Sequence, residues 1–585
     1  MNRLTAVLLM CCVVSGCERP RTLVPKERQA TTMGSSQSER EHLTAALDYL
    51  QRADEFEESQ SGFQVAYHLN RWLDLQKEPS TWQPDPLTAK LPRDVRNSRE
   101  VSDLGRLRFT IEDARAVQEA VWLSQIAHWI SPRTADAELE AWISQHVTGG
   151  DSLEAEQLTV AHRLFDWTVR NIQLDELLPY PADVAAQPTP QPGQVVQTVV
   201  PPPQRGIPGP GYQFFPWQTL LYGRGDSWQR ARVFVLLCRQ QGIDAFMLAF
   251  PGKTTTPRPR PWLAAVLVGE RLYLFDPRLG LPIFGAGGHG IATLEQVLAD
   301  PQLLAALTLD DTHRYELDPA DLKEILVLLD ASPTALSRRM KAVEQQLTGK
   351  YRVALTVSAS ATAAKTQRCR GISDVALWSV PFETEWYQQA QADRREKDDR
   401  AAMEHELEFG IFSLRVALVQ ARYLHFRGEL ESQGEKPGAK ALYLQSRLPQ
   451  EQLNAFTSSE EIQKQLGFTR DKDVRDVIWQ ARLKSSQHMM QQAKRHATYW
   501  LGLAQYDSGK FDAAVEWFER RTLEGSPGSP WLSGARYNLG RTYEALHDFE
   551  KACRWYEASE PSPQEHGNRL RARWLRQRQP RPAGN

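Results

Sequence analysis

The sequence has few cysteines, no long apolar run beyond its first residues and almost no excess charge of either sign. Six cysteines among 585 residues are too few for a disulfide scaffold. Lysine and arginine number 70, against 72 aspartates and glutamates. This balance excludes the basic excess typical of a dedicated nucleic-acid-binding protein. After the N-terminal segment, no apolar run approaches the roughly 20 residues that a membrane span requires.

What the sequence does contain is ample material for packed cores. Hydrophobic residues make up 41% of the chain, and 17 of its residues are tryptophan. Because domains average ~100–200 residues, the length predicts roughly three to five domains. Helical periodicity dominates, and a few short apolar runs are typical of strands. The predicted fold class is therefore α+β and multidomain, but mainly helical.

The N-terminus carries a targeting pattern. Met1-Asn2-Arg3 precedes an apolar stretch from Leu4 to Val14, and Ser15-Gly16-Cys17 follows. A basic start, a short apolar core and small residues before the cut describe a secretory signal. The pattern resembles a bacterial lipoprotein signal, which implies removal of residues 1–16 and lipid attachment at Cys17. An ordinary cleaved signal with a coincidental cysteine is the alternative.

The lipoprotein resemblance also implies a location. Acyl chains on Cys17 would make the membrane a partner, and several chains anchor stably where one alone is marginal. Glu18, rather than an aspartate, follows the cysteine. Under the sorting rule of enteric bacteria this favours the outer membrane, facing the periplasm. We therefore expect a protein of the cell envelope.

Composition shifts divide the rest of the first half. Residues 17–40 have no apolar period and predict a flexible tether, while residues 41–150 predict a helical region. Within that region Thr110, with Asp113 three residues later, predicts a helix start. Eleven of the 36 prolines lie in residues 179–216. We expect an extended, mostly exposed insertion there, because proline lacks a backbone donor.

Residues 151–310 combine helices with short strands. An amphipathic helix is expected over residues 151–175, and a buried helix over Trp228–Gln241 with Gly242 after it. Asp244–Phe250 predicts a buried strand. Trp262–Val268 and Arg271–Asp276, separated by two residues, predict a β-hairpin.

These elements resemble the transglutaminase-like domain of the papain-type thiol superfamily. Three segments carry the resemblance: Phe165–Ile172, Ala231–Ala245 and Leu272–Pro277. In that family a cysteine thiolate at a helix N-terminus, a histidine on the next strand and an aspartate on the third form the catalytic triad. The resemblance places Ser227, Arg260 and Asp276 at those positions.

At two of these three positions the residue therefore cannot perform the family's chemistry. A serine hydroxyl has no useful acidity without a base, and arginine does not deprotonate at working pH. We expect a pseudoenzyme with no intact catalytic site, no metal and no cofactor. Asp226 and Arg230, beside Ser227 and Arg260, either line the former cleft or simply cap the helix. The alternative is an active hydrolase or amide-transfer enzyme that uses Ser227 with a base elsewhere, such as His289.

The remaining three cysteines, Cys238, Cys369 and Cys553, are widely spaced. This spacing gives no metal-ligand pattern, and each is expected to pack as a small apolar residue. Residues 311–480 predict a mixed, mainly helical region. In it we expect a helix over Pro319–Leu329, strands over Tyr351–Ser358 and Asp374–Val380, and long helices over Glu385–Leu430.

An internal repeat occupies residues 481–562. Tyr499-Trp-Leu-Gly502 recurs as Tyr537-Asn-Leu-Gly540, and Ala514 recurs as Ala552, both at an offset of 38. The pattern resembles the tetratricopeptide repeat, whose unit is about 34 residues. These four small residues let paired helices approach closely. Residues 421–445 are a candidate third, degenerate unit, and residues 563–585 predict a capping helix with a solvated arginine face and a basic tail.

The resemblances together predict a function. Tetratricopeptide repeats imply a protein or peptide partner, and near-neutral charge argues against nucleic acid. The leading interpretation is a lipid-anchored envelope protein that acts as a protein-binding scaffold and carries a catalytically degenerate transglutaminase-like domain. The rival interpretations are the Ser227 enzyme and a purely structural spacer in the envelope.

Overall fold

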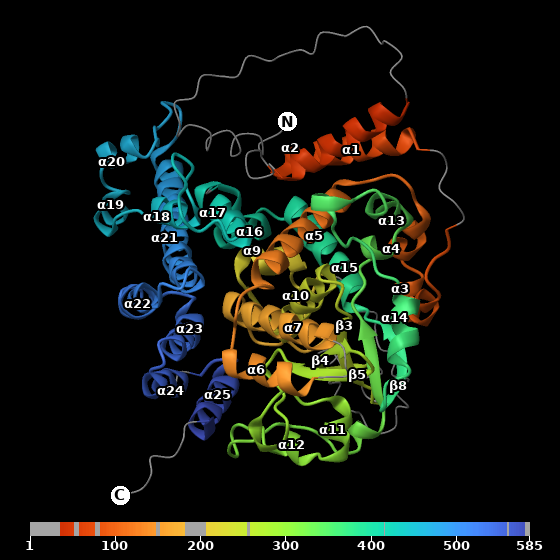
Figure 1. Cartoon of the computed structure of the whole chain (residues 1–585). Helices are drawn as coiled ribbons and strands as arrows, with labels where there is room; N and C mark the ends of the chain where they lie inside the picture. The colour runs from red at the N-terminus through yellow and green to blue at the C-terminus, as the bar shows by residue number, and fades with distance from the viewer. Residues whose placement is uncertain are drawn as a thin grey trace, which may run out of the picture.

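The computed structural model describes residues 35–51, 58–76, 82–147, 152–181, 206–253, 258–414, 416–558 and 561–578. Cys17 and most of the proline-rich insertion lie outside these ranges. The chain is a mainly helical α+β protein with one six-stranded mixed sheet and a C-terminal helical region (Figure 1). Helix α1 (Ser35–Gln51) begins inside the stretch expected to be a tether. None of the described helices is long and apolar enough to cross a membrane.

The sheet has the strand order β6-β5-β4-β3-β7-β8. All neighbouring strands pair antiparallel except β7 and β8, which are parallel. The predicted strand and hairpin are present as β3, β4 and β5. The strands are β3 (Ala245–Phe250), β4 (Arg260–Val268), β5 (Arg271–Asp276), β6 (Leu281–Pro282), β7 (Ile325–Leu329) and β8 (Ile372–Leu377). A separate short pair joins β1 (Gln173–Leu174) to β2 (Arg224–Gly225).

Two expectations for the middle of the chain were wrong. The helix expected over Pro319–Leu329 is strand β7 from Ile325 onward, because this aliphatic run pairs on both sides, with β3 and β8. A short, continuous apolar run of this kind is typical of a buried central strand. The strand expected over Tyr351–Ser358 does not form. The N–H groups of Leu355 and Thr356 donate to the Glu344 carboxylate, so a side chain takes the place of a neighbouring strand.

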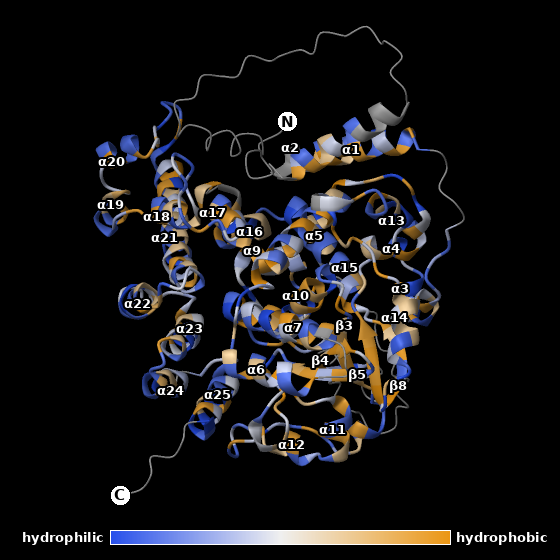
Figure 2. Cartoon of the chain, in the orientation of Figure 1, coloured by the Kyte–Doolittle hydropathy of each residue, from blue (hydrophilic) through white to orange (hydrophobic). Residues whose placement is uncertain are grey.

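Helices cover both faces of the sheet. Along β4, Ala264, Val266 and Val268 face one core, and Leu263, Ala265 and Leu267 face the other. The strands are strongly hydrophobic, as a sheet buried on both faces requires (Figure 2). The first core is covered by α5 (Ile111–Ile130), α7 (Ser152–Asn171) and α10 (Ser227–Gln240). The second is covered by α11 (Leu294–Ala299), α14 (Ala359–Thr366), the start of α15 (Val380–Lys397) and a 3-10 helix, Pro86–Lys90.

The predicted helix start at Thr110 and the predicted helix end at Gly242 are both present in the structure. Thr110 and Asp113 form a reciprocal capping box at the start of α5, and Gly242 adopts a positive φ of 69° just after α10. The described end of the proline-rich insertion differs from the expectation. Tyr212 is only 4% exposed and packs against Tyr387 of α15, so this end is packed rather than exposed.

Smaller helices complete the first two thirds of the chain. They are α2 (Glu58–Asp74), α3 (Arg93–Arg96), α4 (Arg99–Ser102), α6 (Ala137–His146), α9 (Pro216–Tyr222), α12 (Gln302–Ala305) and α13 (Arg338–Glu344). The later helices are α16 (Asp399–Leu414), α17 (Val416–Phe426), α18 (Ala439–Gln445), α19 (Gln450–Ala455), α20 (Glu460–Gln465), α21 (Asp476–Asp507), α22 (Phe511–Val515), a π-helix (Glu516–Glu524), α23 (Leu532–Ala545), α24 (Phe549–Glu557) and α25 (Glu565–Arg578).

The C-terminal helices are not a separate module. Trp167 of α7, Phe234 of α10, Trp500 of α21 and Trp531 beside α23 all belong to one hydrophobic core. Figure 1 shows α23 and α25 running beside α7 and α6. The two parts of the chain therefore bury each other's apolar surface.

Candidate functional site

The three residues that the sequence resemblance singled out, Ser227, Arg260 and Asp276, lie at one end of the sheet. Helix α10 begins at Ser227, and β3 returns along it after a short turn. Because β3, β4 and β5 pair antiparallel in succession, the start of β4 at Arg260 and the end of β5 at Asp276 lie at that same end.

The side chain of Arg260 nevertheless faces away from α10. A register shift between Met247 and Ala249 sets Phe250 opposite Arg260, and Phe250 belongs to the core on the far face of the sheet. The guanidinium lies 5.5 Å from the centroid of the Phe250 ring. Its Nη1 donates to Asp321 at 3.0 Å. Arg260 is thus held in an ion pair on the face opposite Ser227.

Asp276 is also engaged elsewhere. Its Oδ1 accepts the N–H groups of Arg278 and Leu279 at 2.8 and 3.0 Å, which caps the turn after β5. Strand alternation sets Asp276 on the face of Leu272 and Leu274, away from α10. Burial, and then the neighbouring Asp276 carboxylate, raise the pKa of the Tyr315 hydroxyl well above its ordinary value.

No histidine takes the place of the missing base within the described residues. The Ser227 side chain is only 7% exposed. His289 lies in a pocket of about 240 Å³ between α6 and α25, where Trp142 and Trp574 line the walls with it. In the described part of the chain no hydrogen bond joins His289 to Ser227, so the arrangement lacks a serine–base pair.

Asp226 and Arg230 do not line a cleft. Asp226 is 2% exposed and caps α10 by accepting the N–H groups of Trp228 and Gln229. Burial raises its pKa to about 6, although its backbone hydrogen bonds act in the opposite direction. Of the two alternatives that the sequence left open, Asp226 therefore follows the helix-cap one rather than the cleft.

Arg230 is 1% exposed and joins three segments of the chain. Its guanidinium donates to the carbonyl oxygens of Ile172 and Pro277 and to Gln564 Oε1, at 2.6, 3.0 and 2.7 Å. Gln564 lies in the segment before α25, so this arginine fixes that segment to the α/β half. Burial lowers its pKa to about 10.

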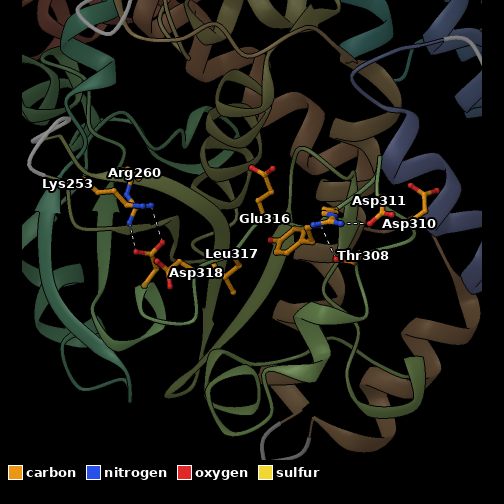
Figure 3. Close-up of a pocket in the computed structure, with 11 residues that line it drawn as sticks. Lys253, Arg260, Thr308, Asp310, Asp311, Glu316, Leu317 and Asp318 are labelled. Carbon is orange, nitrogen blue, oxygen red and sulfur yellow. Dashed lines mark hydrogen bonds and ion pairs between the residues drawn. The ribbon is translucent and has the colours of Figure 1, made fainter. Parts of the chain in front are cut away.

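An open pocket of about 980 Å³ lies beside the start of β4 (Figure 3). Its two arginines are engaged, Arg260 with Asp321 and Arg314 with Asp311. Among the described residues no group of histidine, cysteine, aspartate and glutamate side chains is arranged to hold a metal ion. The pocket is lined by Lys253, Arg260, Thr308, Asp310, Asp311, Arg314, Tyr315, Glu316, Leu317, Asp318 and Asp321.

The three described cysteines are buried and free. Burial raises the pKa of the Cys238 thiol far above its ordinary value. A thiol in such surroundings is a poor nucleophile, because the thiolate is the reactive form. Cys369 and Cys553 are 6% and 4% exposed.

The internal repeat has one packing contact that occurs twice. A Cβ on Gly502 would lie 2.5 Å from the Phe518 ring, and a Cβ on Gly540 would lie 2.5 Å from the Tyr556 ring. The second pair follows the first by 38 residues. Ala514 and Ala552 are fully buried in the corresponding second helices. Close approach at small residues therefore sets the geometry of both helix pairs.

Comparison with known proteins singles out this region. The tetratricopeptide repeat profile matches residues 495–520, which run from the end of α21 through α22 into the π-helix. No curated protein and no solved structure is significantly similar to the chain. A tetratricopeptide motif is a protein-interaction element, so the C-terminal region carries a possible protein-binding function.

A buried charge network, which the sequence analysis missed, joins the repeats to α7. Arg170 lies 2.7 Å from Asp507 and 2.9 Å from Asp166, and Asp166 lies 2.8 Å from Arg541. His425 pairs with Asp507 at 3.0 Å. Burial alone would raise the pKa of Asp507, but Arg170 and His425 lower it to about 2. Only Arg170 and Asp166 are close in the sequence, at a helical spacing of four residues. The other partners are 82 residues or more apart, so no spacing in the sequence indicates the network.

The arginines of α25 are engaged as well. Arg571 pairs with Glu544 of α23 at 2.6 Å, and Arg578 pairs with Asp136 before α6 at 3.2 Å. Arg576 pairs with Glu557 of α24. Arg571 and Arg578 thus hold the capping helix between the repeats and the α/β half, while the side chain of Arg576 is 54% exposed, as expected for a solvated face. Helices α17 and α18, the candidate third unit, pack on each other, and α18 packs on α21.

A groove of about 360 Å³ opens where the repeats meet the rest of the chain. The sequence analysis did not predict this groove. The acidic and aromatic residues that α16 contributes to it do recur at helical spacing. Its lining comes from β1, α9, β2, α16, α21 and the segment before α23. The residues are Gln173, Tyr222, Arg224, Glu404, Leu407, Glu408, Phe409, Phe412, His488, Gln492, His496, Pro530 and Trp531.

Proposed function

We propose that the protein is a lipid-anchored scaffold of the cell envelope that binds a protein partner through its C-terminal repeats. The tetratricopeptide match at residues 495–520 carries this proposal. The mutual burial of the repeats and the α/β half supports a scaffold role, since a rigid connection holds a bound partner in a defined place. Attachment through Cys17 follows from the lipoprotein resemblance of the N-terminal segment.

In this proposal the α/β half is a transglutaminase-like fold without thiol chemistry. Ser227 stands at the nucleophile position, and the side chains of Arg260 and Asp276 lie on the other face of the sheet. General-base catalysis requires the base within about 2.6–3.2 Å of the nucleophile, or one water away. The positions of these groups therefore favour a binding function over hydrolysis or amide transfer.

Site-specific photo-crosslinking in the intact cell tests the binding role. A benzoylphenylalanine is placed at Glu550 on α24, whose side chain is 88% exposed, and in a second strain at Glu295 on α11, whose side chain is 56% exposed. We expect a discrete crosslinked partner from the repeat position and none from the α/β position. Crosslinks from Glu295 alone, or from neither position, would contradict the proposal.

A further inference from the structure

The groove between α16 and the repeats has a chemistry that selects its ligand. Resting on the proposed binding function, we infer that this groove takes an extended peptide segment in which a lysine or arginine neighbours a large apolar side chain. The inference concerns the partner's chemistry, and three features of the groove carry it.

The first feature is a continuous aromatic wall. The rings of Tyr222 and Phe409 are stacked with centroids 4.7 Å apart, and Phe412 lies 4.7 Å from Tyr222. His496 meets Phe412 and Trp531 edge-on at 5.6 and 5.1 Å. Burial lowers the pKa of His496 to about 4, so this ring is neutral at physiological pH. A groove of about 360 Å³ with such walls accepts large apolar side chains.

The second feature is acidic charge at the rim. Glu404 and Glu408 lie one helical turn apart on α16 and both line the groove. Two nearby cations are already paired, Arg224 with Asp175 and Arg400 with Glu404, each at 2.8 Å. Glu408 is therefore the rim carboxylate that no ion pair engages among the described residues. Burial raises the pKa of Glu408, Arg224 lowers it and Asp175 raises it. Burial is the largest of these influences, so a cation brought in by a ligand would stabilise the Glu408 carboxylate, and an anionic ligand would be repelled by it.

The third feature is the position of the groove. Helix α21 contributes His496 from within the matched repeat and His488 and Gln492 from just before it. The α/β half contributes Gln173 and Arg224. Gln173 is itself tied to the second repeat, because it donates to Pro530 O and accepts from Gly534 N at 2.8 and 2.9 Å. A ligand in the groove therefore contacts walls that are fixed relative to one another, which lowers the ordering cost of binding.

Peptide selection tests the inference. The full chain carrying Cys17→Ala is immobilised and a phage library of random heptapeptides is selected on it. We expect enriched clones to carry lysine or arginine adjacent to tryptophan, phenylalanine or leucine. Enrichment of acidic peptides, or of no sequence class, would overturn the inference. In that case a partner crosslinked from Glu550 would still support the binding function. Failure of the groove inference is therefore distinguishable from failure of the proposed function.

The most enriched clone is then made as a labelled peptide and its affinity measured by fluorescence anisotropy. Glu408→Lys should weaken binding at least tenfold, because it reverses charge at the rim. Glu406→Lys makes the same change in net charge on the same helix outside the groove, and it should alter affinity less than twofold. Replacing the peptide's cation by glutamine should reproduce the loss. Equal losses in both variants, or none in either, would refute a cation-selecting groove.

Discussion

Asp166 Oδ1 lies 2.8 Å from Arg541 Nη2, and this ion pair joins helix α7 of the α/β half to helix α23 of the second repeat. The two side chains are 7% and 3% exposed. Removing one partner of a buried pair leaves an uncompensated charge, which costs more than the pair contributes. The stability of the whole chain therefore depends on a contact between residues 375 positions apart in the sequence.

Arg541→Met should lower the free energy of unfolding by about 3 kcal/mol, measured by urea denaturation. The matched control is Arg554→Met, since Arg554 pairs with Glu550 on the exposed face of α24 at 3.4 Å. Exposed pairs contribute about 0–1 kcal/mol, so this control should unfold like the wild type. Equal losses of unfolding free energy in both variants would show that the buried network does not hold the repeats to the α/β half.

Gly502→Ala should destabilise the repeats by about 1–2 kcal/mol, because the new Cβ would lie 2.5 Å from the Phe518 ring in the core. Gly410→Ala on α16 is the control. There the new Cβ would meet only the end of the flexible Glu406 side chain, and alanine favours a helix over glycine by about 1 kcal/mol. We expect Gly410→Ala to be neutral or stabilising in thermal unfolding, and a loss as large as that of Gly502→Ala would contradict this reasoning.

Glu119→Gln should make stability less dependent on pH. Glu119 on α5 accepts the Trp217 N–H at 3.0 Å, and burial raises its pKa from 4.5 to about 7, although that hydrogen bond lowers it. The wild type therefore loses stability as pH rises from about 4.5 through 7, because the buried carboxyl must ionise. A glutamine at this position can still accept the Trp217 N–H hydrogen bond, but its side chain does not ionise.

The measurement is urea denaturation of wild type and Glu119→Gln at pH 8 and pH 4.5. At pH 8 the variant should be more stable by roughly 1–3 kcal/mol, and at pH 4.5 the two should agree. The same difference at both pH values would exclude ionisation of Glu119 as the cause.

A fluorophosphonate probe should not label the native protein at Ser227. The hydroxyl is nearly buried and the described residues provide it no base, and an unassisted serine is a weak nucleophile. The readout is mass spectrometry of the treated chain beside the Ser227→Ala variant. Labelling that disappears in the variant would favour the hydrolase alternative over the pseudoenzyme.

Cys17→Ala should move the protein from the membrane fraction to the soluble fraction. The expectation follows from the lipobox-like Val14-Ser15-Gly16-Cys17 sequence. The check is fractionation and immunoblotting, with Cys553→Ala as the control because Cys553 is buried in α24. Retention of the Cys17 variant in membranes would defeat the anchor hypothesis.

Local patterns in the sequence predicted many elements well. The capping pair Thr110 and Asp113, the hairpin β4–β5 and the repeated helix pairs each depend on neighbours within a few turns of chain. Strand β7 was mistaken for a helix because a run of five aliphatic residues fits either structure. Pairing with β3 and β8 makes this segment a strand, and those two strands lie far from it in the sequence.

The candidate site was harder to predict. Ser227, Arg260 and Asp276 lie at one end of the sheet, and one register shift beside Ala249 decides which face Arg260 occupies. A slip of one residue turns every side chain of a strand to the other face of the sheet. No pattern in this sequence indicates the register of β4. The groove around Glu408 and Trp531 joins segments hundreds of residues apart, so only the folded chain brings it together.

The burial of α7 under the last helices also sets an order of events in synthesis. Residues 152–171 leave the ribosome long before α23 and α25 exist, and at about 5–20 residues per second the delay is roughly 20–80 seconds. During that time Trp167, Asp166 and Arg170 lack the partners that enclose them in the finished protein. The first half of the chain therefore completes its core only when the last helices have been made. A chain shortened near residue 530 keeps Asp507 but lacks Arg541 and α25, so part of that surface stays uncovered.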